Sequence, residues 1–416
     1  MSAKVGVPRE VRPGERRVAL VPATVPKLLA LGVEVLVEAG AGAAGYFPDD
    51  EYANAGARLV ASPAELFAQA DIVVKVQPPT LEEAALTHAG QALVGFMEPA
   101  LRLEQVVLLR DRGVTAFAME LLPRITRAQS MDALTSQASI TGYRGALAAA
   151  SALGRFFPML TTPTGTIRPA KVLVLGAGVA GLQAIATCRR LGAMVEAYDV
   201  RPAAREQVES LGARFLSLEV DASAAGGYAR ALTPEERVLE GRLVSEHVAQ
   251  ADAVITTAAL PGRKAPLLVT REMVERMRPG SVIVDLAAEG GGNCELTEPG
   301  ATVVHQDVTV LGPLNVPSEL PVNASETYAR NILDFLGLLL ADGELAPRWD
   351  DEVVAGTVLT RDGAVPHGPT LELLEQSTRE REGGGPAGER PGEAGPANAG
   401  ATGERPASGT GAEATA

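Results

Sequence analysis

Val172-Leu-Val-Leu-Gly176-Ala-Gly178-Val-Ala-Gly181 decides the fold of this chain. The apolar run predicts a buried strand, and the pattern G-x-G-x-x-G that follows it opens a stretch of helix-forming residues. A second apolar run, residues 195–198, is followed by Asp199, which lies 18 positions beyond Gly181 (199 − 181). That separation is close to the spacing of about 20 residues typical of dinucleotide-binding folds. Residues 171–201 therefore predict a strand–turn–helix–strand unit that binds a dinucleotide.

Each residue type in this unit has a physical task. Gly176 permits a tight turn, Gly178 lets the backbone approach a pyrophosphate, and Gly181 allows the helix to pack closely on the sheet. The helix N-terminus offers unpaired N–H groups and a positive dipole end to phosphates. In this context a glycine turn without a ligand is the weaker interpretation.

The residues around Asp199 predict a preference for NAD(H). Asp199 can accept hydrogen bonds from ribose hydroxyls, and its charge would repel the 2′-phosphate of NADP(H). Arg201 opposes this preference, since a basic residue there can favour the phosphate. Further predicted cofactor-binding residues of this domain are Val179, Val200 and Ala259.

The rest of the chain predicts an α/β fold of two doubly wound Rossmann-like domains. At 416 residues the chain is too long for one ordinary core. Apolar runs at 5–7, 34–38, 72–76, 92–96 and 114–119 form a first series, and those at 172–175, 195–198, 253–256, 282–285 and 302–305 form a second. Long helical patterns at 132–155 and 323–340 separate and follow them. We expect the second domain to be inserted into the first and joined to it by the long helices.

The predicted boundaries follow from these patterns. The first, discontinuous α/β domain comprises residues 1–135 and 310–376, and the NAD(H)-binding Rossmann domain comprises residues 136–309. Residues 377–416 contain almost no large apolar side chains and predict a disordered tail.

Composition excludes several functions. The net charge of −14, without a basic stripe, argues against binding of nucleic acid. The four histidines and two cysteines have no metal-ligand spacing, so no metal site is predicted. No apolar stretch approaches the roughly 20 residues of a membrane-spanning helix. We expect no direct membrane span and a location inside the cell.

Two further polar segments are candidates for the site. Residues 123–135, Pro-Arg-Ile-Thr-Arg-Ala-Gln-Ser-Met-Asp-Ala-Leu-Thr, follow the last predicted strand of the first series and so lie at its carboxyl edge, where ligands bind in doubly wound sheets. On composition alone they could equally be a solvated loop with a helix N-cap at Ser130. Residues 221–231, which contain Gly226-Gly-Tyr228, could be either a mobile flap or a passive surface loop.

Together these segments resemble the soluble, NAD(H)-binding component of the alpha subunit of the proton-translocating NAD(P) transhydrogenases. The resemblance runs from Lys4 to about Pro366 and includes Gly6-Val-Pro-Arg-Glu10, Arg17-Val-Ala-Leu-Val-Pro22 and Val316-Pro-Ser-Glu-Leu-Pro-Val-Asn-Ala-Ser325. Its most specific motif is Arg127-Ala-Gln-Ser-Met-Asp132.

The resemblance implies roles for residues outside the glycine turn. It implies that the nicotinamide end is held by four residues, with Thr135 where many members carry serine, and that Tyr228 sits on a mobile loop that closes over NAD(H). The residues implied to be catalytic are Arg124, Gln129, Asp132 and Tyr228, and the further implied cofactor-binding residues are Arg127, Thr135 and Gly227.

The resemblance also implies partners. In that family the component is a homodimer that docks on an NADP(H)-binding beta subunit, and hydride passes directly between the two nicotinamides, coupled to proton movement through separate membrane-spanning subunits. It therefore implies a cytoplasmic protein held at the inner face of the cell membrane by its partners.

Two alternatives stay open. Alanine dehydrogenase looks like a close relative, and Arg17 and Lys75 match its substrate-binding positions. However, its catalytic histidine would fall within residues 94–99, where there is none, and Glu289 stands where an aspartate is expected. The other alternative is a non-catalytic module that binds NAD(H) and reports the redox state to a partner.

Overall fold

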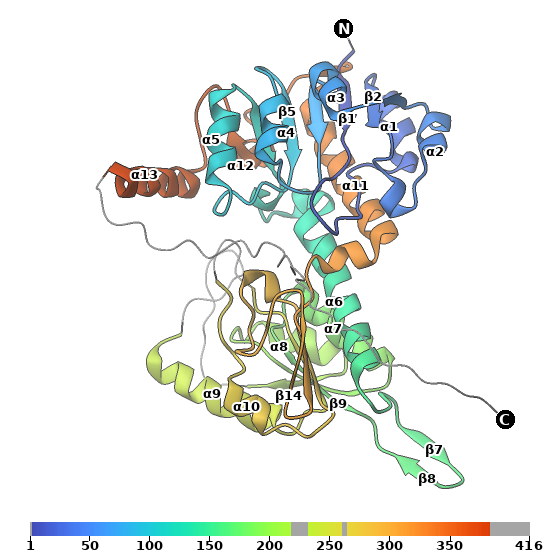
Figure 1. Ribbon diagram of the computed structural model, residues 1–416, viewed down its shortest axis with the longest axis vertical. Helices are drawn as coiled ribbons and strands as arrows, with labels where there is room; N and C mark the ends of the chain where they lie inside the picture. The colour runs from blue at the N-terminus through green and yellow to red at the C-terminus, as the bar shows by residue number, and fades with distance from the viewer. Residues whose placement is uncertain (1, 218–231, 260–263, 383–416) are drawn as a thin grey trace, which may run out of the picture. The chain divides into compact units, whose positions relative to one another are not determined.

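The computed structural model describes residues 2–217, 232–259 and 264–382 (Figure 1). Their strands form two large sheets, both dominated by parallel pairs, and two small antiparallel pairs. We refer to each large sheet with the helices packed on it as the first and the second lobe. The expected α/β class with two Rossmann-like halves is confirmed.

The first sheet has the order β18-β6-β5-β4-β1-β2-β3, in which β1 to β6 run parallel and β18 pairs antiparallel with β6. Because β18 follows the whole second sheet in the chain, the second lobe is an insertion in the first. The strands are β1 (Lys4–Val7), β2 (Glu34–Glu38), β3 (Arg58–Val60), β4 (Ile72–Val74), β5 (Ala92–Gly95), β6 (Thr115–Ala118) and β18 (Val358–Thr360). The accompanying helices are α1 (Val25–Ala30), α2 (Asp49–Asn54), α3 (Pro63–Gln69), α4 (Leu81–Leu86), α5 (Leu103–Asp111) and α12 (Glu352–Thr357).

Alternating side chains give the first sheet two buried faces. Val5 and Val7 of β1 lie in a core shared with Leu28 of α1 and Phe335 of α11 (Pro321–Leu339). Gly6, between them, faces the opposite side, where an added Cβ would lie 2.8 Å from the Leu66 side chain of α3. Strands buried on both faces explain the uninterrupted apolar runs of the sequence.

The second sheet has the order β11-β10-β9-β12-β13-β15-β14. Its strands are β9 (Lys171–Leu175), β10 (Met194–Tyr198), β11 (Arg214–Leu216), β12 (Ala253–Thr256), β13 (Val282–Asp285), β15 (Val308–Leu311) and the antiparallel β14 (Thr302–His305). Buried side chains of α6 (Ala133–Ala152), α7 (Val179–Arg190) and α8 (Ala204–Ser210) cover one face, and those of α9 (Pro234–Val248) and α10 (Arg271–Glu275) cover the other.

One long helix belongs to both lobes. Ala133, the first residue of α6, lies in the core of the first lobe, whereas Ala146 and Ala149 lie in the core of the second. The other long helix, α11, contributes its buried side chains to the first core. Expected helices at 132–155 and 323–340 are therefore present with slightly different ends.

Several local features differ from the expectation. The connector between the long helix and the glycine turn contains an exposed hairpin, β7 (Leu160–Thr162) and β8 (Gly165–Ile167) (Figure 1). Short strands β3 and β11 were not predicted, since three residues give too little periodicity. The second sheet extends through β15 to Leu311, past the expected boundary at 309.

The carboxyl-terminal region also differs. The expected tail begins at 377, whereas α13 (Gly368–Glu382) remains helical to Glu382, and residues 383–416 lie outside the described residues. Between α11 and α12 lies the short pair β16 (Leu340–Ala341) and β17 (Glu344–Leu345). None of the helices that the structure describes combines the length and apolarity needed to cross a membrane.

Candidate functional site

The second sheet has a topological switch point between β9 and β12. From β9 the chain moves outward through β10 to β11, and it then returns to the other side of β9 as β12 and β13. Ligands of doubly wound folds bind outside the carboxyl ends of the strands at such a point. Here these ends are followed by the glycine turn after β9 and by Thr257 to Ala259 after β12.

Two of the three glycines are required by the protein itself. Gly176 has a φ of +99°, and its N–H donates to the Tyr198 carbonyl at 2.8 Å, so the turn is tied to the end of β10. A Cβ on Gly181 would lie 1.9 Å from the Gly176 carbonyl oxygen. Any side chain at 181 would therefore push α7 away from the turn.

Gly178 is different, because nothing in the described protein requires it to be glycine. Its φ is −77°, which any residue adopts, and a Cβ placed on it would meet no atom within 4 Å. Gly178 is the N-cap of α7 and provides no side-chain cap, so the first N–H groups of this 12-residue helix have no intrahelical acceptor. Open space thus lies beside a helix terminus that favours an anion.

Asp199 lies beside this turn and is already engaged by the protein. Its carboxylate accepts hydrogen bonds from the Ala177 N–H at 2.8 Å and from two guanidinium nitrogens of Arg201 at 2.8 Å each. Burial raises the pKa of Asp199, but the hydrogen bonds from Arg201 and Ala177 outweigh it and hold the pKa below its usual value. The carboxylate is therefore ionised, and Arg201 points at it.

The remaining predicted residues of this lobe are distributed around the crevice. Val179 begins α7 and is exposed, and Val200 packs against the core of the α9 face. Ala259, after β12, is exposed at the end of a described segment. Gly227 and Tyr228 lie outside the described residues.

The polar segment after β6 forms a 3-10 helix, η4 (Thr126–Met131), that leads into α6. Asp132, rather than Ser130, caps α6: its carboxylate accepts the Thr135 N–H at 2.9 Å and the Thr135 hydroxyl at 2.7 Å. The solvated-loop interpretation with a cap at Ser130 is therefore wrong in its cap. Gln129 is exposed, and no hydrogen bond to its side chain is found within the described ranges.

Arg127 makes a contact that the sequence did not indicate. Its two terminal nitrogens donate to the two carboxylate oxygens of Asp351, both at 2.8 Å. Hydrogen bonding from Arg127 holds the pKa of Asp351 well below its usual value. Arg127 thus ties η4 to the start of α12, while Arg124 lies exposed on the same segment.

The basic residues that match the substrate positions of alanine dehydrogenase are neutralised inside the first lobe. Lys75 is 1% exposed and lies 2.6 Å from Glu83 and 3.2 Å from Glu10. Arg17 is 5% exposed and forms a bidentate pair with Glu15, at 2.9 and 2.7 Å. Neither cation can receive a substrate carboxylate without giving up a buried partner.

Glu15 itself is fixed as an anion. Burial raises the pKa of Glu15, but the hydrogen bond and charge of Arg17, with hydrogen bonds from Ser318 and Gln77, lower it to about 2. The Gln77 amide donates to Glu15 at 2.6 Å. This buried network was missed because its members are scattered through the sequence and meet only in the fold.

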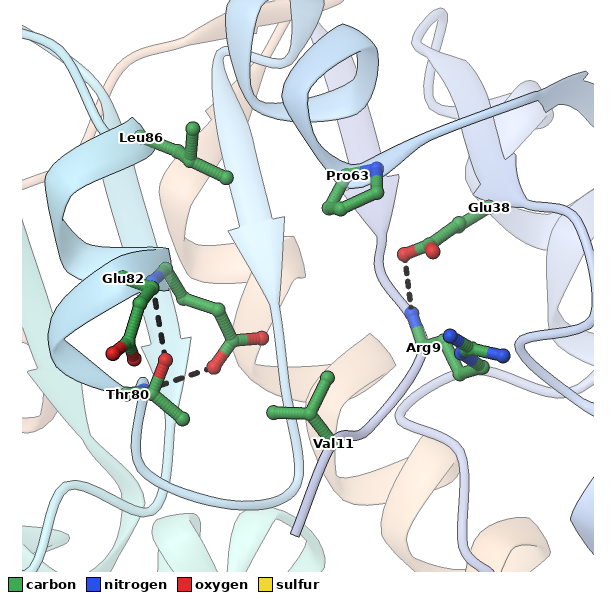
Figure 2. Close-up of a pocket in the computed structure, with 8 residues that line it drawn as sticks. Arg9, Val11, Glu38, Pro63, Thr80, Glu82 and Leu86 are labelled. Carbon is green, nitrogen blue, oxygen red and sulfur yellow. Dashed lines mark hydrogen bonds between the residues drawn. The ribbon is translucent and has the colours of Figure 1, made fainter.

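A hollow of about 340 Å³ lies elsewhere in the first lobe (Figure 2). Arg9 and Glu38 lie on one side of it, and Thr80, Glu82 and Leu86 lie on the other. It contains none of the predicted cofactor-binding residues. Glu38 accepts the Arg9 N–H at 2.9 Å, so its carboxylate already serves the loop after β1.

The strand order and the glycine turn define a two-lobed protein of the Rossmann class. Sequence comparison is more specific. The N-terminal domain of the family "Alanine dehydrogenase/PNT" matches residues 6–141, and its C-terminal domain matches residues 145–368. The chain belongs to this alanine dehydrogenase/PNT family, whose members bind NAD(H).

Within the family the chain is more similar to transhydrogenases. It is 47% identical over 375 residues to an NAD(P) transhydrogenase subunit alpha from Rhodospirillum rubrum, covering 88% of this chain and 98% of that protein. The alanine dehydrogenase of Bacillus subtilis is 32% identical over 370 residues, covering 87% and 92%. The crystal structure of a transhydrogenase from Sinorhizobium meliloti superposes with a TM-score of 0.77 at 45% identity, covering 88% of this chain and 99% of that one.

Proposed function

We propose that the chain is the NAD(H)-binding component of a proton-translocating transhydrogenase. In this proposal it holds NAD(H) in the second-lobe crevice and exchanges a hydride with NADP(H) bound on a separate beta subunit. The observation that carries the binding step is the open space beside Gly178 at the N-terminus of α7. A backbone that lacks a side chain where the protein has no use for the vacancy is what close approach of a pyrophosphate requires.

The ribose end supports NAD(H) rather than NADP(H). Asp199 is ionised beside the turn and carries a charge that a 2′-phosphate would meet. Arg201 could attract that phosphate, but its guanidinium is bound to Asp199. We infer that Arg201 orients the carboxylate and offsets only a fraction of its repulsion. Val179 and Val200 flank this end in the proposed site, and Ala259 faces it from the loop after β12.

For the nicotinamide end we propose Arg124, Gln129, Asp132 and Thr135. Asp132 and Thr135 hold one another at the start of α6, which gives the pair a defined geometry for the carboxamide and ribose. The exposed Gln129 amide offers both a donor and an acceptor. Arg127, bound to Asp351, acts in this proposal by positioning η4.

The chemistry asked of the protein is modest. Bound NAD(H) would supply the hydride donor or acceptor carbon. The chain's residues bind and orient the ring and exclude water, and hydride transfer needs no acid or base from the protein. Gly227 and Tyr228 are proposed, from the resemblance, to close over the site.

Alanine dehydrogenase chemistry is less well supported. Its proton transfer needs a histidine that residues 94–99 do not provide. The cations at its substrate positions, Lys75 and Arg17, are paired with buried carboxylates. A redox-sensing module without catalysis would have no use for an exposed Gln129 beside the Asp132–Thr135 pair.

The partners follow from the same proposal. We infer a homodimer, an NADP(H)-binding beta subunit and separate membrane-spanning subunits that carry the proton. The chain would then be peripheral at the cytoplasmic face of the membrane. For the domains we propose that the dinucleotide-binding lobe extends from 136 to the end of β15 and that the other lobe comprises the flanking segments.

A reconstitution tests this function. The purified chain is mixed with the NADP(H)-binding component of a known transhydrogenase, NADPH and oxidised acetylpyridine adenine dinucleotide, and reduction of the analogue is followed. We expect turnover only with both proteins, a loss of at least about tenfold with Gln129→Asn, and wild-type turnover with Gln207→Asn, an exposed change on α8. Alanine-dependent reduction of NAD by the chain alone, without turnover in the mixture, would overturn the proposal.

A further inference from the structure

Asp285 is a fully buried carboxylate at the carboxyl end of β13. One of its oxygens accepts the Thr256 hydroxyl at 2.8 Å and the Ala287 N–H at 3.1 Å. The other accepts the N–H groups of Asn293 at 2.7 Å and Cys294 at 3.0 Å, and the Thr297 hydroxyl at 2.6 Å. Five donors around one carboxylate fix the loop that follows β13.

Asn293 passes this order on to the loop after β12. Its side chain is completely buried. Its amide oxygen accepts the Ala258 N–H at 3.0 Å, and its amide nitrogen donates to the carbonyls of Ala258 and Pro266, both at 2.8 Å. Both backbone groups of Ala258 are therefore bound by one side chain, which copies the pairing that a neighbouring strand would supply.

The same loop contacts the glycine turn directly. The Thr257 hydroxyl donates to the Gly176 carbonyl at 3.0 Å. That oxygen also limits the close approach of Gly181 on α7, which would bring an added Cβ to 1.9 Å. A continuous set of hydrogen bonds thus joins Asp285, Asn293, Ala258 and the turn across the switch point between β9 and β12.

We propose that Asn293, held by Asp285, is a positioning residue for the bound dinucleotide. It touches no predicted ligand atom, and it acts by holding Thr257 to Ala259 at one wall of the crevice whose other wall is the glycine turn. The inference rests on the proposed binding of NAD(H) in this crevice. It assigns a role to two residues outside the glycine motif and the polar segment after β6.

An amide is required at 293 for a chemical reason. Alanine would leave the N–H and the carbonyl of Ala258 without their partner, and water could enter beside the turn. Aspartate would keep an acceptor for the Ala258 N–H but lose both donations to carbonyls, next to the buried charge of Asp285. The loop, freed from one or both contacts, would sample positions that do not match the ligand.

The test compares Asn293→Ala with a control that disturbs the same carboxylate. Thr297→Val removes a hydrogen bond to Asp285 but leaves the Ala258 contacts in place. Dissociation constants for NADH are measured by fluorescence titration of the full chain, together with melting temperatures. We expect NADH binding to weaken roughly tenfold or more in Asn293→Ala, and to stay within about twofold of wild type in Thr297→Val.

Each outcome has a distinct meaning. Unchanged NADH affinity in Asn293→Ala, or equal weakening in both variants at equal melting temperature, would overturn the positioning role. If Asn293→Ala does not fold, Asn293→Asp takes its place with the same expectation and the same contrary result. Failure of the wild-type chain to bind NADH would instead overturn the proposed function.

Discussion

At the scale of single residues, Glu120 in η3 (Met119–Leu121) is a carboxyl group with few partners. One oxygen accepts the N–H groups of Met97 at 2.8 Å and Glu98 at 2.5 Å, while the other has no hydrogen-bond partner within the described residues. Burial raises the pKa of Glu120 to about 7, against backbone hydrogen bonds that lower it. The protonated form is therefore favoured in the folded chain.

This gives a pH-dependent stability with a definite sign. The folded chain holds the Glu120 proton more tightly than the unfolded chain, so the stabilising contribution is complete below about pH 4.5 and is lost as the pH rises to about 7. We expect Glu120→Gln to remove this dependence, a difference of about 3 kcal/mol in unfolding free energy between the two ends of that window. Urea unfolding at pH 4.5 and pH 8 measures it. Glu51→Gln, an exposed change on α2, is the control, and parallel pH profiles of Glu120→Gln and wild type would contradict the assignment.

Asp199 carries a second residue-scale prediction, on cofactor choice. Asp199→Asn keeps an acceptor for the Ala177 N–H but removes the charge that Arg201 neutralises. We expect NADH to bind roughly tenfold more weakly and NADPH more strongly, as read from dissociation constants for both. Asp252→Asn is a matched control, because Asp252 also accepts a backbone N–H, from Lys171, and pairs with Arg155 outside the crevice. An unchanged ratio of the two affinities in Asp199→Asn would refute the role.

At the scale of elements, the contact of α6 with α7 links the proposed nicotinamide residues to the glycine turn. Asp132 caps α6, and ten residues later a Cβ on Gly142 would lie 2.0 Å from the Ala180 carbonyl oxygen in the first turn of α7. Ten residues of helix span about 15 Å. The α6 helix therefore sets the distance between two regions of the proposed site.

Two glycine substitutions on α6 separate this contact from helix propensity. Both Gly142→Ala and Gly145→Ala gain up to about 1 kcal/mol of helix propensity. Gly142→Ala meets backbone, whereas Gly145→Ala meets the flexible Leu286 side chain. We expect the Gly142 variant to be less stable than the Gly145 variant by about 2 kcal/mol in urea unfolding and to bind NADH more weakly. Equal stability and affinity of the two variants would show that the close approach is unimportant.

At the scale of the whole molecule, the inserted topology makes the carboxyl-terminal region belong to the first lobe. Val358 of β18 lies in the first core, and β18 covers the edge of β6. The composition of residues 383–416, in contrast, predicts no contribution to a core.

Paired truncations test this division. A chain that ends at Glu382 should keep the melting temperature and NADH affinity of the full chain. A chain that ends at Trp349 loses α12 and β18 and exposes the β6 edge, so we expect it to be several kcal/mol less stable or to aggregate. Circular dichroism melts and size-exclusion chromatography report both effects. Loss of stability in the longer chain, or none in the shorter, would contradict the expected division.

Local patterns were enough for much of the fold. The glycine turn, Asp199 and the apolar runs predicted β9, β10, β12, β13 and the insertion of one Rossmann half in another, because strand and helix periods and glycine conformations are properties of adjacent residues. They failed at short elements such as β3, and at α13, whose polar residues continue a helix without an apolar stripe.

What the sequence by itself determined is therefore the class of fold, the turn that a dinucleotide needs, and the residues that resemble a transhydrogenase. Only the tertiary structure decided which charges are already paired. It joined Arg127 to Asp351, Arg201 to Asp199 and Lys75 to Glu10 and Glu83. It also placed Asn293 on Ala258, 35 positions away in sequence. Periodicity records only neighbours along the chain, whereas pairing of buried polar groups depends on loops that meet at one edge of a sheet.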